Sequence, residues 1–259
     1  MTAFLLELCV ESLGAAQAAE AGGANRIELC TDLRVGGVTP PIELTEEVVR
    51  SLAIPVHVLI RARGGDFVFS AREFDQMRRQ IEQVKAAGAA GVAIGVLLPD
   101  GRVDVERSRE LADLARPMKV TFHRAFDETP DLSEALEAVI GSGADCLLTS
   151  GGAPEVQTGA QSIAQLCREA CGRLDVMAGG GLKLANLADV LQRTGVRFLH
   201  GSLKRREPQT TPETQTGGHR AVEGPSLLEA DVREAVRMIH EEVSAQEIFA
   251  RGTAPQIAG

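Results

Sequence analysis

The chain has 259 residues, a formal net charge of −9, and 44% hydrophobic and 24% charged residues. These values are ordinary for a soluble globular protein and allow one large hydrophobic core. The acidic balance and the absence of tryptophan and tyrosine argue against nucleic-acid binding, which needs a basic surface and is helped by aromatic stacking.

The amino-terminal segment has no basic stretch, and Glu7 interrupts its apolar run, so we expect no signal peptide. No apolar run approaches the roughly 18 residues that a membrane span needs, so we expect no membrane partner. The five cysteines are an odd number, which argues against a secreted disulfide framework. We therefore expect a cytoplasmic protein with reduced thiols.

Short apolar runs alternate with segments of helical periodicity along the chain. The apolar runs predict eight β-strands, near Leu5–Val10, Arg26–Cys30, Pro55–Arg61, Gly91–Val96, Lys119–Phe126, Cys146–Gly151, Leu174–Gly179 and Phe198–Ser202. The intervening segments predict helices, near Ser12–Ala21, Glu43–Leu52, Ala71–Ala87, Val105–Ala115, Leu132–Ser142, Ser162–Cys171, Leu184–Gln192 and Leu227–Val243.

Strands that alternate with helices through short loops indicate a parallel sheet with right-handed crossovers. Eight such units close most economically into an α/β fold of the (β/α)8 TIM-like barrel type, formed here as a single domain. A doubly wound open sheet is the alternative, although it would need longer and more apolar central strands.

We place the barrel domain at residues 1–248, with a polar loop at 205–225 and a flexible C-terminal tail at 249–259. The polar loop follows the last strand, so it would lie at the functional end of a barrel. A disordered insertion without a role is the other interpretation.

Ionisable and thiol side chains occur inside the predicted strands, where an inert barrel would carry branched apolar residues. Residues two apart share a strand face, which pairs Glu7 with Cys9 and Glu28 with Cys30. Buried charges are costly unless paired. They either form a salt-bridge network in which Glu7 and Glu28 neutralise Arg61 or Arg124, or they surround a polar pocket at the carboxyl ends of the strands. We prefer the pocket, whose candidate catalytic residues are Glu7, Glu28, His57, His123 and Asp127.

Cationic and glycine-rich segments follow several strands, and they predict an anion site. Arginine forks suit carboxylate or phosphate, and bare backbone amides after the seventh and eighth strands of a barrel form a phosphate-binding loop. The alternative is that the glycines only serve tight turns. The candidate anion-binding residues are Arg61, Arg63, Asp66, Arg124, Thr149, Ser150, Gly179, Gly180, Gly181, Gly201 and Ser202.

Several of these segments, in this order, resemble the CutC family. They include Glu7-Leu8-Cys9, Arg26-Ile27-Glu28-Leu29-Cys30, Gly36-Gly37-Val38-Thr39-Pro40, Arg61-Ala62-Arg63-Gly64-Gly65-Asp66-Phe67, Thr121-Phe122-His123-Arg124-Ala125-Phe126-Asp127 and Met177-Ala178-Gly179-Gly180-Gly181. The resemblance covers about residues 4–204. It implies a TIM-like barrel, a cytoplasmic protein, a part in copper homeostasis, and Cu(I) binding by cysteines. Beyond residue 205 the chain is polar, whereas the family often has an aromatic and basic stretch there.

Cys9 and Cys30 form the candidate metal site, because Cu(I) prefers thiolate ligands. Two-coordinate Cu(I) would need their sulfurs about 4–5 Å apart, which adjacent parallel strands permit. The alternative is that both are small buried hydrophobic residues. Cys146, Cys167 and Cys171 are expected to pack in the core.

Two functions therefore remain open: Cu(I) binding, or a barrel enzyme that acts on a small anionic or phosphorylated metabolite by acid–base chemistry. In the second, His123 would lie within hydrogen-bond or one-water reach of Glu7, Glu28 or Asp127. The anion would bind Gly179–Gly181, Gly201 and Ser202, with Arg61 or Arg63 reaching it. The sequence leaves the oligomeric state open, a homo-oligomer included.

Overall fold

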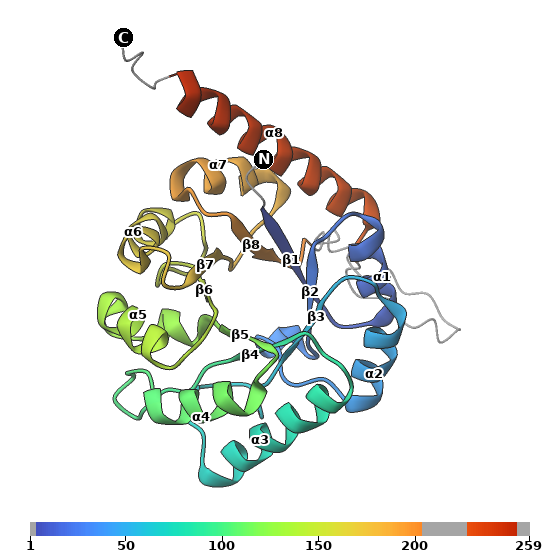
Figure 1. The fold of residues 1–259 in the computed structure, drawn as a ribbon, viewed down its shortest axis with the longest axis vertical. Coiled ribbons are helices and arrows are strands. Elements are labelled where there is room, and N and C mark those ends of the chain that lie inside the picture. The colour runs from blue at the N-terminus through green and yellow to red at the C-terminus, as the bar shows by residue number, and fades with distance from the viewer. Residues whose placement is uncertain (1–3, 204–226, 253–259) are drawn as a thin grey trace, which may run out of the picture.

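A computed structural model describes residues 4–203 and 227–252 of the chain. Eight parallel strands close into one barrel in the order β1 to β8, which confirms the predicted fold, and the helices form a ring outside it (Figure 1). The strands are β1 Leu5–Val10, β2 Arg26–Leu29, β3 Val56–Leu59, β4 Gly91–Ile94, β5 Lys119–Phe122, β6 Cys146–Thr149, β7 Asp175–Ala178 and β8 Phe198–Gly201. The helices are α1 Leu13–Ala21, α2 Ile42–Ser51, α3 Ala71–Ala86, α4 Val105–Ala115, α5 Leu132–Gly141, α6 Ala160–Ala170, α7 Leu184–Thr194 and α8 Glu229–Gly252.

Two element boundaries differ from the sequence prediction by more than two residues, and two predicted segments lie wholly or partly outside the described residues. Strand β5 ends at Phe122, because residues Arg124–Glu128 form a 3-10 turn, η2. Helix α8 continues to Gly252, past the predicted domain end at 248, and it lies beside α7 and α1 (Figure 1). The predicted loop 205–225 and residues 253–259 of the predicted tail lie outside the described residues. No helix in the described part of the chain is long and apolar enough to span a membrane.

Local sequence determines where the helices begin. Helix α3 has a capping box, in which the Ser70 side chain accepts the Glu73 amide and the Glu73 side chain accepts the Ser70 amide. Asp104 and Asp131 cap α4 and α5 in the same position. These caps satisfy backbone N–H groups that the first turn of a helix leaves without partners. They fix where each helix starts after its loop at the carboxyl end of the barrel.

Alternation along the strands divides the interior into two layers. In β1, Leu6, Leu8 and Val10 are fully buried in the main apolar core, which lies between the strands and the helices. Glu7 and Cys9 alternate with them and face the inside of the barrel, where both are buried. The apolar layer supplies the hydrophobic stabilisation, which leaves the inside of the barrel free to carry polar groups.

Two glycines of the β4 segment make room for histidine rings inside the barrel. A Cβ at Gly91 would lie 2.4 Å from Nε2 of His57, and a Cβ at Gly95 would lie 2.4 Å from Cε1 of His123. No real Cβ contact is that short, so any larger residue there would displace the ring. The glycines therefore position both imidazoles.

We predict that Gly91→Ala lowers the free energy of unfolding by about 1–3 kcal/mol, because the new methyl group overpacks against His57. The control is Gly14→Ala in α1, where a Cβ meets no atom within 4 Å. That change should stabilise the helix by about 0.5–1 kcal/mol. Urea unfolding of both variants measures the difference, and equal effects of the two substitutions would contradict this account of Gly91.

Candidate functional site

A pocket of about 220 Å³ opens at the carboxyl ends of the strands; we call it the mouth pocket. Its ionisable and thiol lining comes from five strands or the loops that follow them. These residues are Cys9, Glu28, Arg61, His123, Arg124 and His200. The predicted polar pocket therefore exists at the predicted end of the barrel, and all of these residues except His200 were candidates from sequence.

His200 joins the two strand carboxylates. Its Nδ1 lies 2.8 Å from Oε1 of Glu7, and its Nε2 lies 3.4 Å from Oε2 of Glu28. The strand register explains the contact, because Glu7 of β1 is the direct partner of His200 on β8. Burial alone would lower the pKa of His200, but the charges of Glu28 and Glu7 raise it overall. The imidazole is thus held in its charged form between two acids.

The two carboxylates differ in their environments. Burial raises the pKa of Glu7, but the Arg26 guanidinium and His200 outweigh this effect and lower the pKa to about 2. Arg26 forms an ion pair with Glu7. Burial raises the pKa of Glu28, and the nearby His200 offsets only part of that rise. Glu7 is therefore a permanent anion, whereas Glu28 holds a proton more readily.

The salt-bridge network predicted as an alternative does form, but with other members. Arg26 neutralises Glu7, whereas Arg124 pairs with Asp127. Arg61 forms no ion pair among the described residues. Arg26 and His200 are the functional residues that sequence reasoning missed. The period-2 rule could have found Arg26, because it shares a β2 face with Glu28.

His57 lies deeper in the barrel and does not line the mouth pocket. Its Nδ1 is 3.8 Å from Oε2 of Glu7, which is too long for a hydrogen bond. Burial lowers its pKa to about 4, against the opposing charge of Glu7. His57 is therefore a neutral ring packed below the site.

His123 lines the mouth pocket but makes none of the carboxylate hydrogen bonds that we expected. Its Nδ1 accepts the Ala125 amide at 3.2 Å, and its Nε2 has no hydrogen-bond partner among the described residues. Burial and the charge of Arg61 lower its pKa to about 3. The strand ends here and turns into η2, which directs the ring toward its own backbone. His200 has the carboxylate contacts that we had assigned to His123.

Asp127 joins two loops through its hydrogen bonds and is not a free base. Its carboxylate accepts hydrogen bonds from the Thr149 hydroxyl, from the Ser150 amide at 3.0 Å and from the Gly152 amide at 3.0 Å. It also pairs with Arg124 at 2.8 Å. These bonds use its acceptor sites to join the loops after β5 and β6. Asp127, Thr149 and Ser150 thus support Arg124 from behind and do not line the mouth pocket.

The two arginines after β3 have different roles. Arg61 is 4% exposed, lines the mouth pocket and lies 4.4 Å above the Phe67 ring. Arg63 donates to Glu73 and Asp66 and to three backbone carbonyls of its own loop. It is not among the lining residues of the mouth pocket, and the prediction of Arg63 and Asp66 as anion ligands stays a prediction. Arg63 and Asp66 stabilise the loop that holds Arg61.

The glycine-rich segment after β7 forms part of the pocket rim. Gly180 and Gly181 line the mouth pocket with φ of +96° and +78°, a region that favours glycine. Gly201 and Ser202 line it from β8. Gly179 instead donates to the Thr149 carbonyl within the barrel. The anion site predicted on these loops stays a prediction, since no observation tests it.

The predicted thiol pair meets at the edge of the mouth pocket. The sulfurs of Cys9 and Cys30 lie 3.3 Å apart and share a hydrogen bond, which is closer than the roughly 4–5 Å expected for two-coordinate Cu(I). Cys30 is fully buried behind Cys9. The hydrogen bond to Cys30, burial and the charge of Glu28 raise the pKa of Cys9. Ligand atoms of Cys9, Glu28 and His200 all lie within 4.8 Å of one another.

The other cysteines lie away from this group. Cys146 is buried inside the barrel and Cys167 is partly buried against the core, as expected. Cys171 is exposed, because α6 ends at Ala170 and Cys171 adopts a left-handed conformation there. The prediction that Cys171 packs in the core is therefore wrong.

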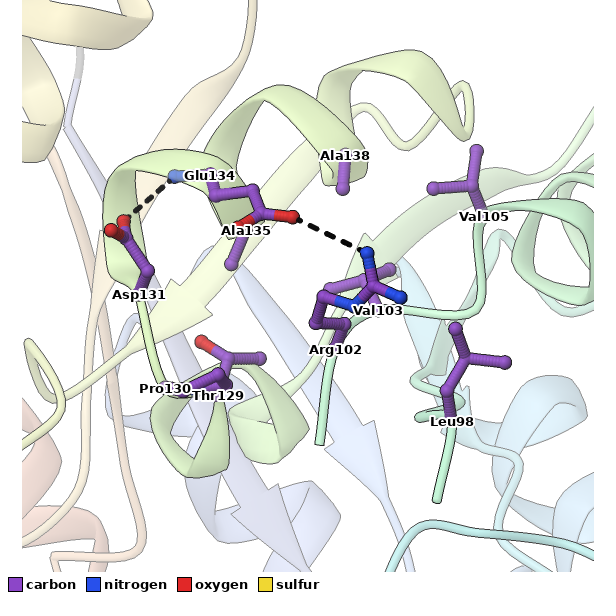
Figure 2. A pocket seen from close by; sticks show the side chains of 10 residues that line it. All are labelled: Leu98, Arg102, Val103, Val105, Thr129, Pro130, Asp131, Glu134, Ala135 and Ala138. Atoms are coloured by element: carbon purple, nitrogen blue, oxygen red, sulfur yellow. Dashed lines mark hydrogen bonds and ion pairs between the residues drawn. The ribbon is translucent and has the colours of Figure 1, made fainter. Parts of the chain in front are cut away.

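A second hollow of about 140 Å³ lies between the loop after β4 and helix α5 (Figure 2). Figure 2 shows Arg102 directed toward Glu134, an ion pair of 3.9 Å, and Asp131 capping the helix. Its remaining walls are mostly apolar side chains such as Leu98 and Val105. None of the predicted site residues lines it, so the mouth pocket is the candidate site.

The model of the CutC family matches residues 4–205. A family protein CutC of Caulobacter vibrioides is 41% identical over 237 residues, which cover 91% of this chain and 96% of the relative. The copper homeostasis protein cutC homolog of Homo sapiens is 43% identical over 201 residues, covering 78% and 74%. The crystal structure of CutC from Streptococcus agalactiae has a TM-score of 0.73 at 29% identity, covering 77% of this chain and 98% of that chain.

We predict that Glu7→Gln lowers the free energy of unfolding by about 3–5 kcal/mol, because it leaves the charge of Arg26 buried without a partner. Glu155→Gln is the matched control, since it breaks an exposed ion pair with Lys183 and should cost about 1 kcal/mol or less. Urea unfolding near neutral pH gives both values. Similar costs for the two variants would show that Glu7 is not a structural anion.

We also predict that the protein loses stability as the pH falls from about 6.5 to about 4. The pKa of His57 in the folded state is lowered to about 4. As the pH falls below the ordinary histidine pKa, the unfolded state takes up a proton that the folded state does not. The folded state therefore loses stability until the pH reaches about 4. The loss should be about 3 kcal/mol. Glu28 acts in the opposite sense, so the test is the comparison of wild type with His57→Gln. The variant should show a flatter dependence of unfolding free energy on pH, and an unchanged slope would contradict the prediction.

Proposed function

The chain belongs to the CutC family, and from this membership we propose that it serves copper homeostasis by binding one Cu(I) ion at the mouth of its barrel. The observation that carries the proposal is the contact between Cys9 and Cys30, whose sulfurs lie 3.3 Å apart beside Glu28 and His200. Relatives in mouse and human are named copper homeostasis protein cutC homolog. We place the protein in the cytoplasm, where both thiols would stay reduced.

The donor set fits Cu(I) better than a harder metal ion. Two sulfurs and an imidazole are ligands that copper favours, and the single carboxylate of Glu28 is a hard ligand. With metal–sulfur bonds of roughly 2.3 Å, sulfurs 3.3 Å apart correspond to a bent arrangement. A linear site would require the sulfurs to separate. A bent pair leaves room for a third donor, and Nε2 of His200 faces that position beside Glu28.

We predict that the wild-type protein binds one Cu(I) per chain in anaerobic competition with a Cu(I) chelator. Cys9→Ser combined with Cys30→Ser should abolish this binding, because it removes both soft ligands. The control is Cys171→Ser, an exposed thiol that should leave the affinity unchanged. The affinity should fall as the pH drops, because the raised pKa of Cys9 means that the ion must displace a proton. If the double mutant binds Cu(I) as tightly as the wild type, the result would contradict this proposal.

The second candidate function is acid–base catalysis on a small anionic or phosphorylated metabolite. The observation that favours it is the position of His200 between Glu7, whose pKa is lowered, and Glu28, whose pKa is raised. Acids with pKa values shifted apart in one pocket are a common arrangement for proton transfer. Glu28 and His200 line the mouth pocket, so they could exchange a proton with a bound ligand.

This second candidate predicts proton exchange into a substrate. Small carboxylated and phosphorylated metabolites would be incubated with the copper-free protein in D₂O, and deuterium incorporation would be followed by NMR. His200→Gln should lower the exchange rate about a hundredfold or more, whereas His240→Gln, an exposed histidine, should have no effect. Exchange that is equally fast with His200→Gln would exclude His200 as the acid–base group.

A further inference from the structure

Arg61 carries a positive charge into the wall of the mouth pocket without a direct ion-pair partner among the described residues. The side chain is 4% exposed and forms no ion pair with any carboxylate of the described residues. Its terminal nitrogens donate to the carbonyls of Val35, Gly37 and Gly65, while its Nε has no partner in the described part of the chain. Buried charges in folded proteins are usually paired. The pocket therefore contains a cation that Glu128 and Asp66 balance only at longer range.

His123 presents a fixed hydrogen-bond donor beside this cation. Its Nδ1 accepts the Ala125 amide, so the proton of the neutral ring must be on Nε2. That Nε2–H has no acceptor among the described residues. Gly95 and Phe67 hold the ring in place. His123 is thus a buried donor without an acceptor among the described residues, a role different from the acid–base role expected from the sequence.

Arg124 supplies a second guanidinium to the same wall. Its Nε pairs with Asp127 and its Nη2 donates to the Ser150 hydroxyl, which fixes the plane of the group. The third nitrogen, Nη1, makes no hydrogen bond among the described residues. Gly180 allows this placement, because a Cβ there would lie 2.9 Å from the guanidinium carbon.

We propose that Arg61, His123 and Arg124 form an oxyanion subsite that binds the carboxylate or phosphate group of a small metabolite. The subsite is built from the loops after β3 and β5; β5 lies opposite β1 in the closed barrel, whereas β3 is separated from β1 by β2 alone. The inference rests on the second candidate function and names the class of its ligand. The sequence prediction also named Arg61 and Arg124 as anion-binding residues, but it placed the anion on the loops after β7 and β8 and gave His123 a catalytic role.

The hydrogen-bond donors of Arg61, His123 and Arg124 are the reason why we expect an anionic ligand. Two guanidinium groups and one imidazole N–H offer hydrogen bonds, and charged donors of this kind bind oxyanions strongly. The same pocket contains Glu28 on β2, the neighbour of β3, and His200 on β8, which can give or take a proton. A ligand that fits about 220 Å³ would therefore have its oxyanion at Arg61 and its reactive end near His200.

Calorimetric titration of the copper-free protein with inorganic phosphate and with malonate tests the subsite and separates its two ligand chemistries. Binding of either anion should weaken about tenfold or more in Arg61→Gln, because a charged hydrogen-bond donor is lost. The control is Arg102→Gln, which removes the same charge from an exposed side chain of a loop at the same end of the barrel. It should change the affinity less than about twofold. Equal affinities of wild type and Arg61→Gln, or no binding of either anion, would overturn the proposal.

NMR of the wild-type protein provides a test that does not depend on whether a variant folds. The imidazole ¹⁵N signals of His123 should report a neutral ring with its proton on Nε2, and the Nε2–H signal should shift when phosphate or malonate is added. A proton on Nδ1, or no shift at saturating anion, would overturn the proposal. If the protein binds the anions but exchanges no proton into any metabolite, the result would support the proposed subsite and contradict only the proposed catalytic function.

Discussion

Glu7 has a negative charge inside a closed barrel. The positions of the neighbouring site residues depend on the contacts that stabilise this charge. An isolated carboxylate there would be neutralised by protonation, but Arg26 and His200 contact it directly. Their combined charge lowers the pKa of Glu7 to about 2 in spite of burial. Because His200 is fixed by Glu7 at one ring nitrogen, its other nitrogen is directed at Glu28. One buried anion thus orients the histidine that faces the pocket.

The rest of the mouth pocket is organised around this fixed centre as two walls with different chemistry. Cys9, Glu28 and His200 bring sulfur, oxygen and nitrogen ligands within 4.8 Å of one another. On the loops after β3 and β5, Arg61 and His123 offer only donors to the pocket. The first wall suits a soft metal ion and the second suits an oxyanion. The proposed copper binding and the proposed anion binding are therefore compatible in one pocket, because they use different residues.

Sequence reasoning predicted the barrel because hydrophobic periodicity and glycine turns depend on local spacing. The strand alternation also predicted that Glu7, Glu28 and Cys9 face one interior. Partner choice could not be predicted, since it depends on how strands far apart in the chain are registered. His200 meets Glu7 only because β8 closes against β1, and Arg63 turns away because Glu73 and Asp66 lie within its reach. The contacts of His123 differ from the prediction because strand β5 ends at Phe122, directly before His123, and not at Phe126 as predicted.

The most direct test of the account is copper K-edge X-ray absorption of the Cu(I)-loaded protein, because it identifies the atoms around the ion. The geometry predicts two sulfur neighbours, from Cys9 and Cys30, and one imidazole nitrogen, from His200. His200→Gln should remove the imidazole scattering and keep the sulfur signal. A spectrum with no sulfur neighbours, or one that Cys9→Ser with Cys30→Ser leaves unchanged, would contradict the claim that the mouth of the barrel binds copper.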